Sequence, residues 1–287
     1  MKKRLINRVN LLDGKKLSSE IKEELKNELA NYSRKVGLAV VLVGNDKASE
    51  LYVSMKKKAC EYVGINSISV ELPEDISQEE LENRVLELNI DSKVDGILVQ
   101  LPLPKHLNTD KILELIDPKK DVDGFHPTNV GGVLTGLDTF APCTPLGMVE
   151  LLDKYEIDIQ GKNVVVVGAS NIVGKPIASL LLNRNATVEI CHIYTQNLKE
   201  HTLKADILVV AVGKENLIGA DMVKDGVVVL DVGINKRADG KIVGDVDFEN
   251  VSKKASYITP VPGGVGPMTI AMLLKNTVKS AKIRDGK

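Results

Sequence analysis

Three polar side chains that could share a catalytic task follow one another at helical spacing in the first third of the chain. Ser49, Tyr52 and Lys56 fall within roughly a 60° arc of one helix face, since each helical residue turns the chain by about 100°. The face would present a hydroxyl, a phenol and an ammonium group together, which suits proton transfer. Lys57 and Lys58 point to other sides of this helix, and we expect them to be solvated.

A glutamine and two carboxylates could complete such a site. Gln100 lies near the end of the apolar run Asp95–Leu101, so we expect it at the carboxyl edge of a parallel sheet, where it could hold Lys56. Asp121 and Asp123 alternate along an extended segment, and such a pair could suggest a metal. No third hard ligand lies nearby in sequence, so we expect no metal. One carboxylate could instead accept two parallel N–H bonds from an amino-pyrimidinone edge.

The segment Pro260–Thr269 is rich in proline and glycine and stands between an apolar strand and a helical tail. Glycines let a flat substrate approach the main chain closely, while prolines stiffen the loop when the site is empty. A rigid interdomain turn is the alternative, but an ordinary turn needs only one such residue. The pattern therefore favours a ligand-binding loop.

A strand, a Gly-rich turn and a helix follow one another after residue 162, which is the arrangement of a nucleotide-binding turn. The turn Gly168–Gly174 has the form Gly-x-Ser-x-x-x-Gly, one residue longer than the dinucleotide fingerprint and with Ser170 in place of its second glycine. Phosphate oxygens could take the free N–H groups of the helix start, and Gly168 would allow close main-chain approach. A tight strand–helix turn in any doubly wound sheet is the alternative.

The end of the next strand, Cys191–Thr195, favours NADP over NAD. An NAD site usually places Asp or Glu there to bind the ribose hydroxyls, and this strand end has no carboxylate. A clear Arg for the 2′-phosphate is also missing, so NAD stays open. His192, Thr195 and Lys175 are the nearest polar candidates, although a lone His at a strand end more often packs or faces solvent.

Alternating apolar strands and amphipathic helices predict two parallel α/β domains. The first series comprises a helix near 15–30 and then Val36–Val43, Ser49–Tyr62, Ile68–Leu72, Gln78–Leu88 and Asp95–Leu101. The second comprises Asn163–Val167, Ile172–Asn183, Thr187–Ile190, Ile207–Val212, Val227–Val232 and Tyr257–Thr259. Gly, Pro and Thr cluster between Asp123 and Leu146, which predicts a join there. We therefore divide the chain into residues 1–140 and 141–266, with a final helix, 267–287, that could cross back to the first domain.

Composition favours a small-molecule partner. The 287 residues are 43% apolar, enough for two cores, and a net charge of -1 gives no field for nucleic acid or an anionic membrane. Aromatic residues are 3% and Trp is absent, which argues against base-stacking platforms. Cys60, Cys143 and Cys191 are widely spaced and indicate reduced thiols in a cytoplasmic chain. The basic start Met1–Arg4 precedes no apolar core of a signal peptide, and nothing reaches transmembrane length.

Taken together, these segments resemble the bifunctional methylenetetrahydrofolate dehydrogenase and methenyltetrahydrofolate cyclohydrolase family. The matching motifs span nearly the whole chain in the family's order: Tyr52-Val53 with Lys56, Asp95–Pro104, Asp121–Phe125, Gly168–Gly174 and Pro262–Thr269. Two departures concern the cofactor. Many members carry Arg where Ala169 stands, and Ser or Arg around Ile193, Tyr194 and Gln196.

The resemblance implies a folate-binding catalytic domain, a Rossmann domain that binds NADP, and a homodimer. Hydride would leave 5,10-methylenetetrahydrofolate for nicotinamide, and water would then open the methenyl product to 10-formyltetrahydrofolate. Lys56 would assist proton transfer in the hydrolysis and Gln100 would position it. Tyr52 would stack against or orient the folate, and Asp123 would grip the pterin edge.

The resemblance also implies the residues around the two ligands. Those implied for folate are Ser49, Val99, Leu101, Pro262 and Gly263, and those implied for the dinucleotide are Gly168, Ala169, Ser170, Gly174, Thr195 and Ile234. Two alternatives remain: another two-domain dehydrogenase of the shikimate or amino-acid kind, and a non-enzymatic folate or nucleotide sensor. The loop Pro262–Thr269 argues against the first, and the intact polar residues named above argue against the second.

Overall fold

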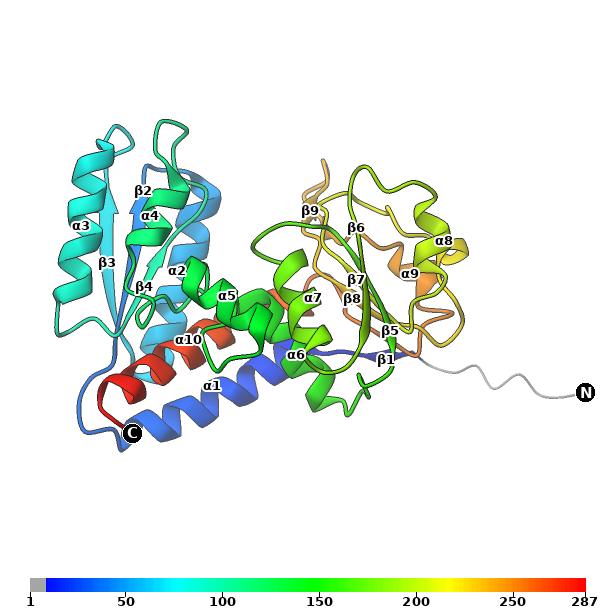
Figure 1. Ribbon diagram of the computed structural model, residues 1–287, viewed down its shortest axis with the longest axis horizontal. Coiled ribbons are helices and arrows are strands. Elements are labelled where there is room, and N and C mark those ends of the chain that lie inside the picture. The colour runs from blue at the N-terminus through cyan, green and yellow to red at the C-terminus, as the bar shows by residue number, and fades with distance from the viewer. Residues whose placement is uncertain (1–8) are drawn as a thin grey trace, which may run out of the picture. The chain divides into compact units, whose positions relative to one another are not determined.

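The structure is a computed structural model that describes residues 9–287, so the basic start Met1–Arg4 lies outside the described residues. The chain forms two compact units (Figure 1). Unit 1 contains residues up to Leu17 together with Thr144–Thr269, and unit 2 contains Ser18–Cys143 together with Ile270–Lys287. Within residues 9–287, no helix is long and apolar enough to span a membrane.

Unit 2 is built on a three-stranded parallel sheet in the order β3-β2-β4. Its strands are β2 (Gly37–Val43), β3 (Asn66–Leu72) and β4 (Gly96–Val99), joined through α2 (Lys47–Val63) and α3 (Gln78–Ile90). The central strand β2 is buried at all seven positions, as a strand covered by helices on both faces must be. The predicted βαβαβ series is therefore confirmed, and the carboxyl ends of β2 and β4 lie side by side, with Val41 opposite Val99.

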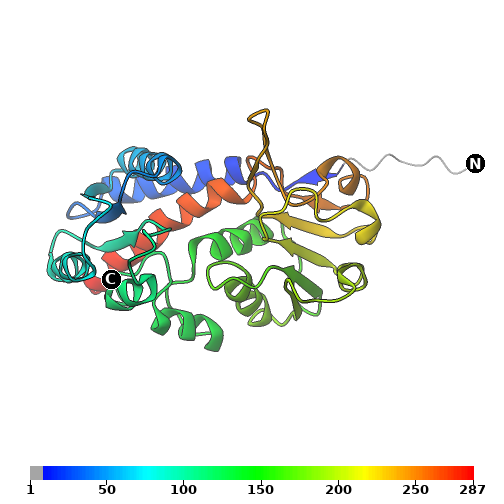
Figure 2. The ribbon, with the colours of Figure 1, turned by 90° about the horizontal axis from the view of Figure 1, so that it is seen from above.

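The last helix, α10 (Val265–Arg284), packs on unit 2 from Ile270 onward, as the fold prediction stated. It runs beside α1 (Gly14–Ala30) in both ribbon views (Figures 1 and 2). An ion pair joins Lys282 to Glu28 at 2.5 Å between these helices. Just beyond the helix, Asp285 accepts hydrogen bonds from Arg34, whose guanidinium also makes two 2.8 Å bonds to the buried carboxylate of Asp95.

Unit 1 is built on a six-stranded sheet in the order β1-β11-β8-β7-β5-β6, with every pair parallel. The strands are β1 (Asn10–Leu11), β5 (Asn163–Val167), β6 (Thr187–Cys191), β7 (Ile207–Val210), β8 (Val228–Asp231) and β11 (Tyr257–Ile258). The chain goes from β5 to β6 on one side and then to β7 on the other, so the strand order reverses at β5. Ligands of doubly wound sheets bind at such a reversal, outside the carboxyl ends of the strands.

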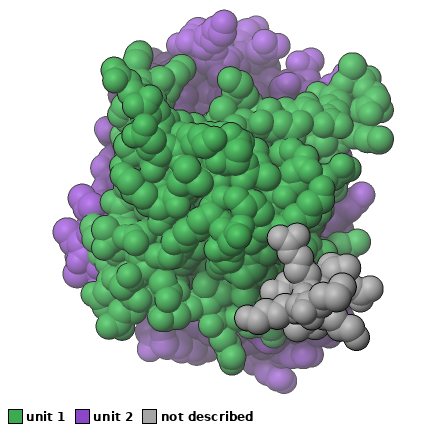
Figure 3. Space-filling view, turned by 90° about the vertical axis from the view of Figure 1, so that its right-hand side faces the viewer, with its two compact units in different colours: residues 1–17, 144–269 green, residues 18–143, 270–287 purple. Residues whose placement is uncertain are grey.

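Residues 9–17 lie in unit 1, which is green in Figure 3, whereas the predicted boundary places them in the first domain. Strand β1 pairs with β11, and the N–H of the fully buried Leu12 donates to the carbonyl of Ile258 at 2.9 Å. A two-residue strand shows no periodicity, so sequence patterns could not reveal it.

The expected loop between Asp123 and Leu146 instead contains α5 (Pro127–Thr135) and the start of α6 (Cys143–Lys154). Pro127 is the first residue of α5, a position where proline is tolerated. Gly132 lies inside this helix, and a larger residue would not fit there because a β-carbon would lie 2.8 Å from the Thr139 side chain. The remaining short elements are α4 (Thr109–Leu115), α7 (Gly174–Leu182), α8 (Leu198–Thr202), η1 (Ala220–Met222), α9 (Phe248–Val251) and a hairpin of β9 (Asn235–Lys236) and β10 (Ile242–Val243). This hairpin, gold in Figure 2, stands out from the sheet of unit 1.

Candidate functional site: a lysine at a sheet edge and a glycine-rich turn

Lys56 is held at the carboxyl edge of the unit 2 sheet. Helix α2 begins directly after β2, where the Asp46 side chain accepts a 2.8 Å bond from the N–H of Ser49 and caps the helix. Two turns after Ser49, Lys56 Nζ donates to Gln100 Oε1 at 2.9 Å, and Gln100 Nε2 donates to the carbonyl of Leu101 at 2.8 Å. The structure therefore contains the expected contact between the helix and the end of β4.

The other residues predicted around Lys56 differ in exposure. The ring of Tyr52, one turn before Lys56 on α2, is 41% exposed and available to a ligand, and Leu101 is partly exposed. Ser49 and Val99 are 4% and 2% exposed and lie in the core. Ser49 and Val99 can therefore act only as packing for the site, and Tyr52 and Leu101 are the two that a ligand can contact.

Asp121 and Asp123 have different environments despite their spacing of two residues. The buried carboxylate of Asp121 is satisfied by four donors: the N–H groups of Gly124 (3.1 Å), Phe125 (3.2 Å) and His126 (2.8 Å) and the Nδ2 of Asn129 (2.8 Å). Asp121 therefore fastens the turn into α5, and Asp123 is the carboxylate outside this set of bonds. Among residues 9–287, no three His, Cys, Asp or Glu side chains are grouped to hold a metal ion.

The surroundings of Asp123 shift the pKa of its carboxyl. Burial of its carboxyl raises its pKa above the ordinary value, and the positive charge of Lys56 opposes that rise. Asp121 adds a smaller unfavourable charge. The residue as a whole is half-buried, and a carboxyl with a perturbed pKa is a candidate for a functional site.

The glycine-rich turn of unit 1 lies at the reversal of strand order. Gly168 directly follows β5 with a φ of +125°, and a β-carbon there would lie 2.3 Å from the carbonyl oxygen of Ala211, which follows β7. A β-carbon on Gly174 would lie 2.0 Å from the carbonyl oxygen of Gly168. Both positions require glycine, because only glycine tolerates this φ and this approach. Ala169 is partly exposed beside them.

The start of α7 offers fewer free donors than predicted. Ser170 Oγ accepts from the N–H groups of Val173 (3.2 Å) and Gly174 (3.4 Å), and the Ser170 carbonyl accepts from Lys175 (3.1 Å). The next residue, Pro176, has no N–H. The turn itself is exposed from Ser170 to Ile172, so an anion would meet the turn before the helix.

The side chains proposed for a 2′-phosphate are engaged within their own loops. Thr195 Oγ1 accepts from the N–H of His192 at 2.8 Å, and Lys175 Nζ donates to Asn171 Oδ1 at 2.7 Å. Ile193 and Tyr194, which stand between His192 and Thr195 just after β6, are 91% and 85% exposed. A ligand at this edge would meet an open surface with no fixed carboxylate.

A pair of buried aspartates, which the sequence analysis missed, holds the loop of Ile234. Asp245 accepts from four donors: the N–H groups of Val212 (2.8 Å), Gly213 (2.9 Å) and Lys214 (2.8 Å) and the Nδ2 of Asn235 (2.9 Å). Asp231 accepts from the N–H groups of Gly233, Asp245 and Val246, each at 3.0 Å, yet desolvation raises its pKa to about 6. Ile234 is 54% exposed on this fastened loop. The feature of the sequence that could have pointed to this pair is the glycine at position 244. A β-carbon added to Gly244 would lie 1.8 Å from the Asp231 carboxylate, so the close approach requires glycine.

The proline- and glycine-rich loop belongs to unit 1 and is tied to the start of α1. Gly263, at a φ of +111°, accepts a 2.8 Å bond from the N–H of Lys15. A β-carbon on Gly14 would lie 1.9 Å from the carbonyl oxygen of Gly264, so Gly14 is a second residue that sequence reasoning missed. Pro262 is exposed at the tip of this loop.

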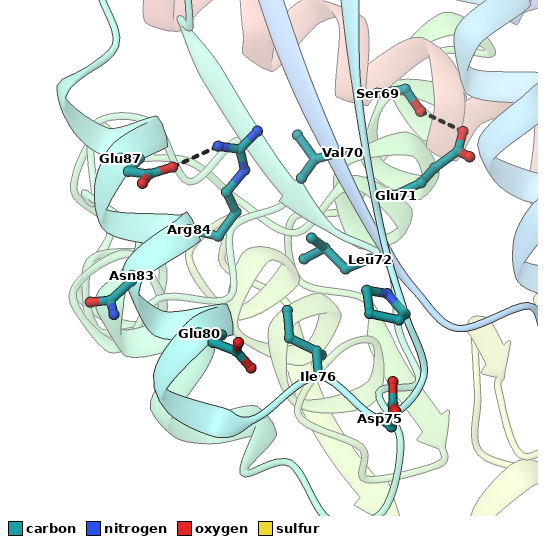
Figure 4. A pocket seen from close by; sticks show the side chains of 11 residues that line it. Ser69, Val70, Glu71, Leu72, Asp75, Ile76, Glu80, Asn83, Arg84 and Glu87 are labelled. Atoms are coloured by element: carbon teal, nitrogen blue, oxygen red, sulfur yellow. Dashed lines mark hydrogen bonds and ion pairs between the residues drawn. The ribbon is translucent and has the colours of Figure 1, made fainter.

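A hollow of the surface lies elsewhere in unit 2, between β3 and α3 (Figure 4). It measures about 740 Å³ and is lined by Ser69, Val70, Glu71, Leu72, Pro73, Asp75, Ile76, Glu80, Asn83, Arg84 and Glu87. Its charged groups pair with their neighbours, as in the 2.6 Å contact of Arg84 with Glu87. None of the predicted site residues lines this hollow.

The fold and the two sites define a two-domain α/β enzyme, with a lysine and a carboxylate on one unit and a dinucleotide-type turn on the other. Residues 12–123 match the tetrahydrofolate dehydrogenase/cyclohydrolase catalytic domain, and residues 142–285 match the NAD(P)-binding domain of the same family. The chain therefore belongs to the tetrahydrofolate dehydrogenase/cyclohydrolase family. This membership favours the predicted bifunctional enzyme over another two-domain dehydrogenase or a sensor.

Individual relatives agree over almost the full chain. Bifunctional protein FolD of Nitratiruptor sp. is 67% identical over 280 residues, covering 96% of this chain and 99% of that protein. The crystal structure of the bifunctional enzyme FolD from Campylobacter jejuni has a TM-score of 0.95 at 60% identity, covering 96% of this chain and 99% of that one. The FolD of Trypanosoma brucei, complexed with NADP cofactor and inhibitor, has a TM-score of 0.92 at 38% identity, covering 97% and 99%.

Proposed function

We propose that this protein oxidises 5,10-methylenetetrahydrofolate with NADP and hydrolyses the resulting 5,10-methenyltetrahydrofolate to 10-formyltetrahydrofolate. The observation that carries the proposal is the 2.9 Å bond from Lys56 to Gln100 at the carboxyl edge of the sheet, beside the exposed ring of Tyr52. A sheet edge of this kind is where a ligand meets an α/β domain. The family of the chain supplies the substrate class.

In the hydrolysis, Lys56 assists the proton transfers as water adds to the methenyl carbon and the ring opens. An ammonium group has three donors, and Gln100 accepts one of them, so two remain for the water and the substrate. Gln100 is itself fixed through its bond to the carbonyl of Leu101. The pair therefore holds the amine in place before the substrate arrives, which is the condition for efficient proton transfer.

The folate would be held by three surfaces. Asp123 accepts two parallel N–H bonds from the amino-pyrimidinone edge, for which its desolvated carboxylate is suited. Tyr52 stacks against the folate, with Leu101 beside it and with Ser49 and Val99 packed behind. Pro262 and Gly263 are the loop residues that we propose for the wall of the pocket.

When bound, the dinucleotide would supply the hydride acceptor for the oxidation of the one-carbon bridge of the folate. The residues present fit it, because Gly168 and Gly174 keep side chains away from the turn where a pyrophosphate would lie. Ala169, Ser170, Thr195 and Ile234 would line its remaining length. The absence of a carboxylate at the end of β6 supports NADP, the cofactor seen with the Trypanosoma brucei relative.

Parallel turnover assays with NADP and with NAD test the proposal. Reduction of the cofactor reports the oxidation, and loss of methenyltetrahydrofolate absorbance reports the hydrolysis. We expect both steps, with NADP preferred. Binding of folate without turnover with either cofactor would show that the protein is a sensor. Turnover in both steps with NAD preferred in the oxidation would overturn only the cofactor assignment.

We also propose a cytoplasmic homodimer whose partner is the folate substrate, without nucleic acid or membrane. The dimer and the location follow from the family resemblance, and the net charge of -1 supports the lack of a polyanionic partner. Light scattering during size-exclusion chromatography measures the mass. A value near that of one 31.2 kDa chain would contradict the dimer.

A further inference from the structure

We propose that Asn276 of α10 is a positioning residue for Asp123, so that the C-terminal helix sets how tightly unit 2 holds its folate. The inference rests on the proposed role of Asp123 in binding the pterin. Asn276 lies far from Asp123 in sequence, and no motif draws attention to it. It is a polar residue that is only 4% exposed, and the turn before it on the helix is packed with the apolar side chains of Met272 and Leu273.

The amide of Asn276 joins the two chain segments on either side of Asp123. Its Nδ2 donates to the carbonyl of Val122 at 2.9 Å and to the carbonyl of Ala141 at 3.2 Å. An amide nitrogen has two N–H groups, so these two bonds use both of them. Val122 immediately precedes Asp123, and the bond therefore fixes the peptide from which the carboxylate side chain departs.

The second segment packs directly on the turn that Asp123 begins. A β-carbon on Gly124 would lie 2.6 Å from the carbonyl carbon of Ala141, so the two backbones are in contact there. The thiol of Cys143 donates to the Val122 carbonyl at 3.3 Å, and its Sγ lies 3.8 Å from Asn276 Nδ2. Asn276 thus lies at the centre of a buried polar cluster directly behind Asp123.

A second contact of α10 shows that the helix fastens this whole segment. Ser280, one turn after Asn276, has its Oγ within 2.6 Å of the Asp95 carbonyl and within 2.7 Å of the Lys119 carbonyl. The segment 119–123 is thereby held to α10 at both ends. Since Asp121 fastens the following turn, the backbone on each side of Asp123 has a fixed partner, and Asp123 is pre-placed for its ligand.

The neighbouring residue offers a matched control. Thr277 is fully buried on the same helix, but its hydroxyl donates at 2.7 Å to the Leu273 carbonyl within the helix and not to the Asp123 segment. Thr277→Val therefore removes one buried polar group from α10 and leaves the contacts of Val122 and Ala141 intact. A purely structural role for Asn276 would make the two substitutions equivalent in kinetics after their stabilities are matched.

The experiment measures steady-state kinetics of the full chain for Asn276→Leu, Asn276→Ser and Thr277→Val. Asn276→Leu keeps the volume of the side chain, and Asn276→Ser keeps a small polar group if the first variant fails to fold. We expect each Asn276 variant to raise the KM for methylenetetrahydrofolate about tenfold, because a displaced binding group loses its alignment. The KM for NADP and kcat should change less than about twofold, and Thr277→Val should leave all three within that range.

A double-mutant cycle with Asp123→Asn decides whether the effect passes through Asp123. In the Asp123→Asn background, Asn276→Leu or Asn276→Ser should raise the folate KM no further, although its thermal destabilisation should persist. A full additional increase in KM would overturn the positioning role while leaving the proposed function intact. An unchanged folate KM in Asp123→Asn alone would instead overturn the pterin-binding role of Asp123, and with it this inference.

Discussion

The two units hold their candidate sites with different parts of the chain. In unit 2 the groups that we propose for the ligand are side chains, namely the ammonium of Lys56, the amide of Gln100 and the carboxylate of Asp123, and the first two are joined by a hydrogen bond. In unit 1 the site is mostly main chain, where Gly168 and Gly174 bring backbone atoms within distances that no side chain permits.

This difference follows from the ligand chemistry proposed for each unit. Proton transfer and recognition of a pterin edge need specific functional groups, which only side chains supply. A pyrophosphate presents oxygens that backbone N–H groups satisfy, so the main requirement is close approach. Substitutions in unit 2 should therefore remove activity from a folded protein, whereas substitutions in the unit 1 turn should disturb the local fold and cofactor binding together.

The largest effect is expected from Lys56→Met, which should lower the rate of methenyltetrahydrofolate hydrolysis by about 10²- to 10⁴-fold, the usual contribution of a proton-transfer group. The oxidation should suffer less, since hydride transfer depends on alignment. A hydrolysis assay with thermal unfolding measures both consequences. Lys57→Met, at an exposed position of the same helix, is the control, and retained hydrolysis in Lys56→Met would refute the assignment.

Gly168→Ala should destabilise unit 1 by about 4 kcal/mol, because the new β-carbon meets the Ala211 carbonyl and the φ of +125° is strained for alanine. NADP affinity should fall with it. Gly226→Ala isolates the strain, since Gly226 has a φ of +83° and no atom within 4 Å of its β-carbon. Denaturant unfolding should show a much smaller loss for Gly226→Ala, and equal losses would mean that the close approach at Gly168 is unimportant.

Asp123→Asn should weaken folate binding by about 2–4 kcal/mol, because it replaces one acceptor of a charge-assisted pair with a donor. NADP affinity should remain nearly constant, since the cofactor turn belongs to unit 1. Calorimetric titration with each ligand measures the two affinities separately. Equal losses for both ligands would assign Asp123 to the support of the fold.

The buried carboxyl of Asp231 in unit 1 should affect the free energy of unfolding and not the reaction. Its pKa of about 6 lies above the unfolded value of 3.8, so the protonated carboxyl stabilises the fold below pH 3.8 and this contribution is lost as pH rises through 6. The difference corresponds to at most about 3 kcal/mol. The measurement is the free energy of unfolding from about pH 3.5 to about pH 7, a range that includes both pKa values. The native protein should show this dependence, and Asp231→Asn should not. An identical pH profile in the two proteins would contradict it.

The smallest effect concerns cofactor choice. Ile193 is 91% exposed at the end of β6, and Ile193→Asp would place a carboxylate where it repels a 2′-phosphate and accepts a ribose hydroxyl. We expect a shift of about 1–3 kcal/mol from NADP toward NAD, measured as the ratio of kcat/KM values. Ile193→Asn, which carries no charge, is the control. A native enzyme that already prefers NAD would remove the basis of this prediction.

The sequence by itself determined the local elements and the chemical groups of the site. Strands such as Asn163–Val167 were predicted with their observed bounds, because unbroken β-branched runs beside turn residues have few other folds available. The helical spacing of Tyr52 and Lys56 and the position of Gln100 at a strand end were enough to predict that Lys56 meets Gln100. These features depend on contacts within a few residues or on the alignment of neighbouring parallel strands.

Only the tertiary structure decided which of several similar groups does what. Asp121 and Asp123 look alike in sequence, yet the carboxylate of Asp121 is engaged by four donors of the following turn and of α5, and Asp123 stays the carboxylate that we propose for a ligand. Gly14 and Asn276 showed no motif, because the atoms they meet, on Gly264 and Val122, lie far away along the chain. A sequence states which donors, acceptors and small residues exist, but packing chooses the pairs that meet, since each buried polar group must find its partner in three dimensions.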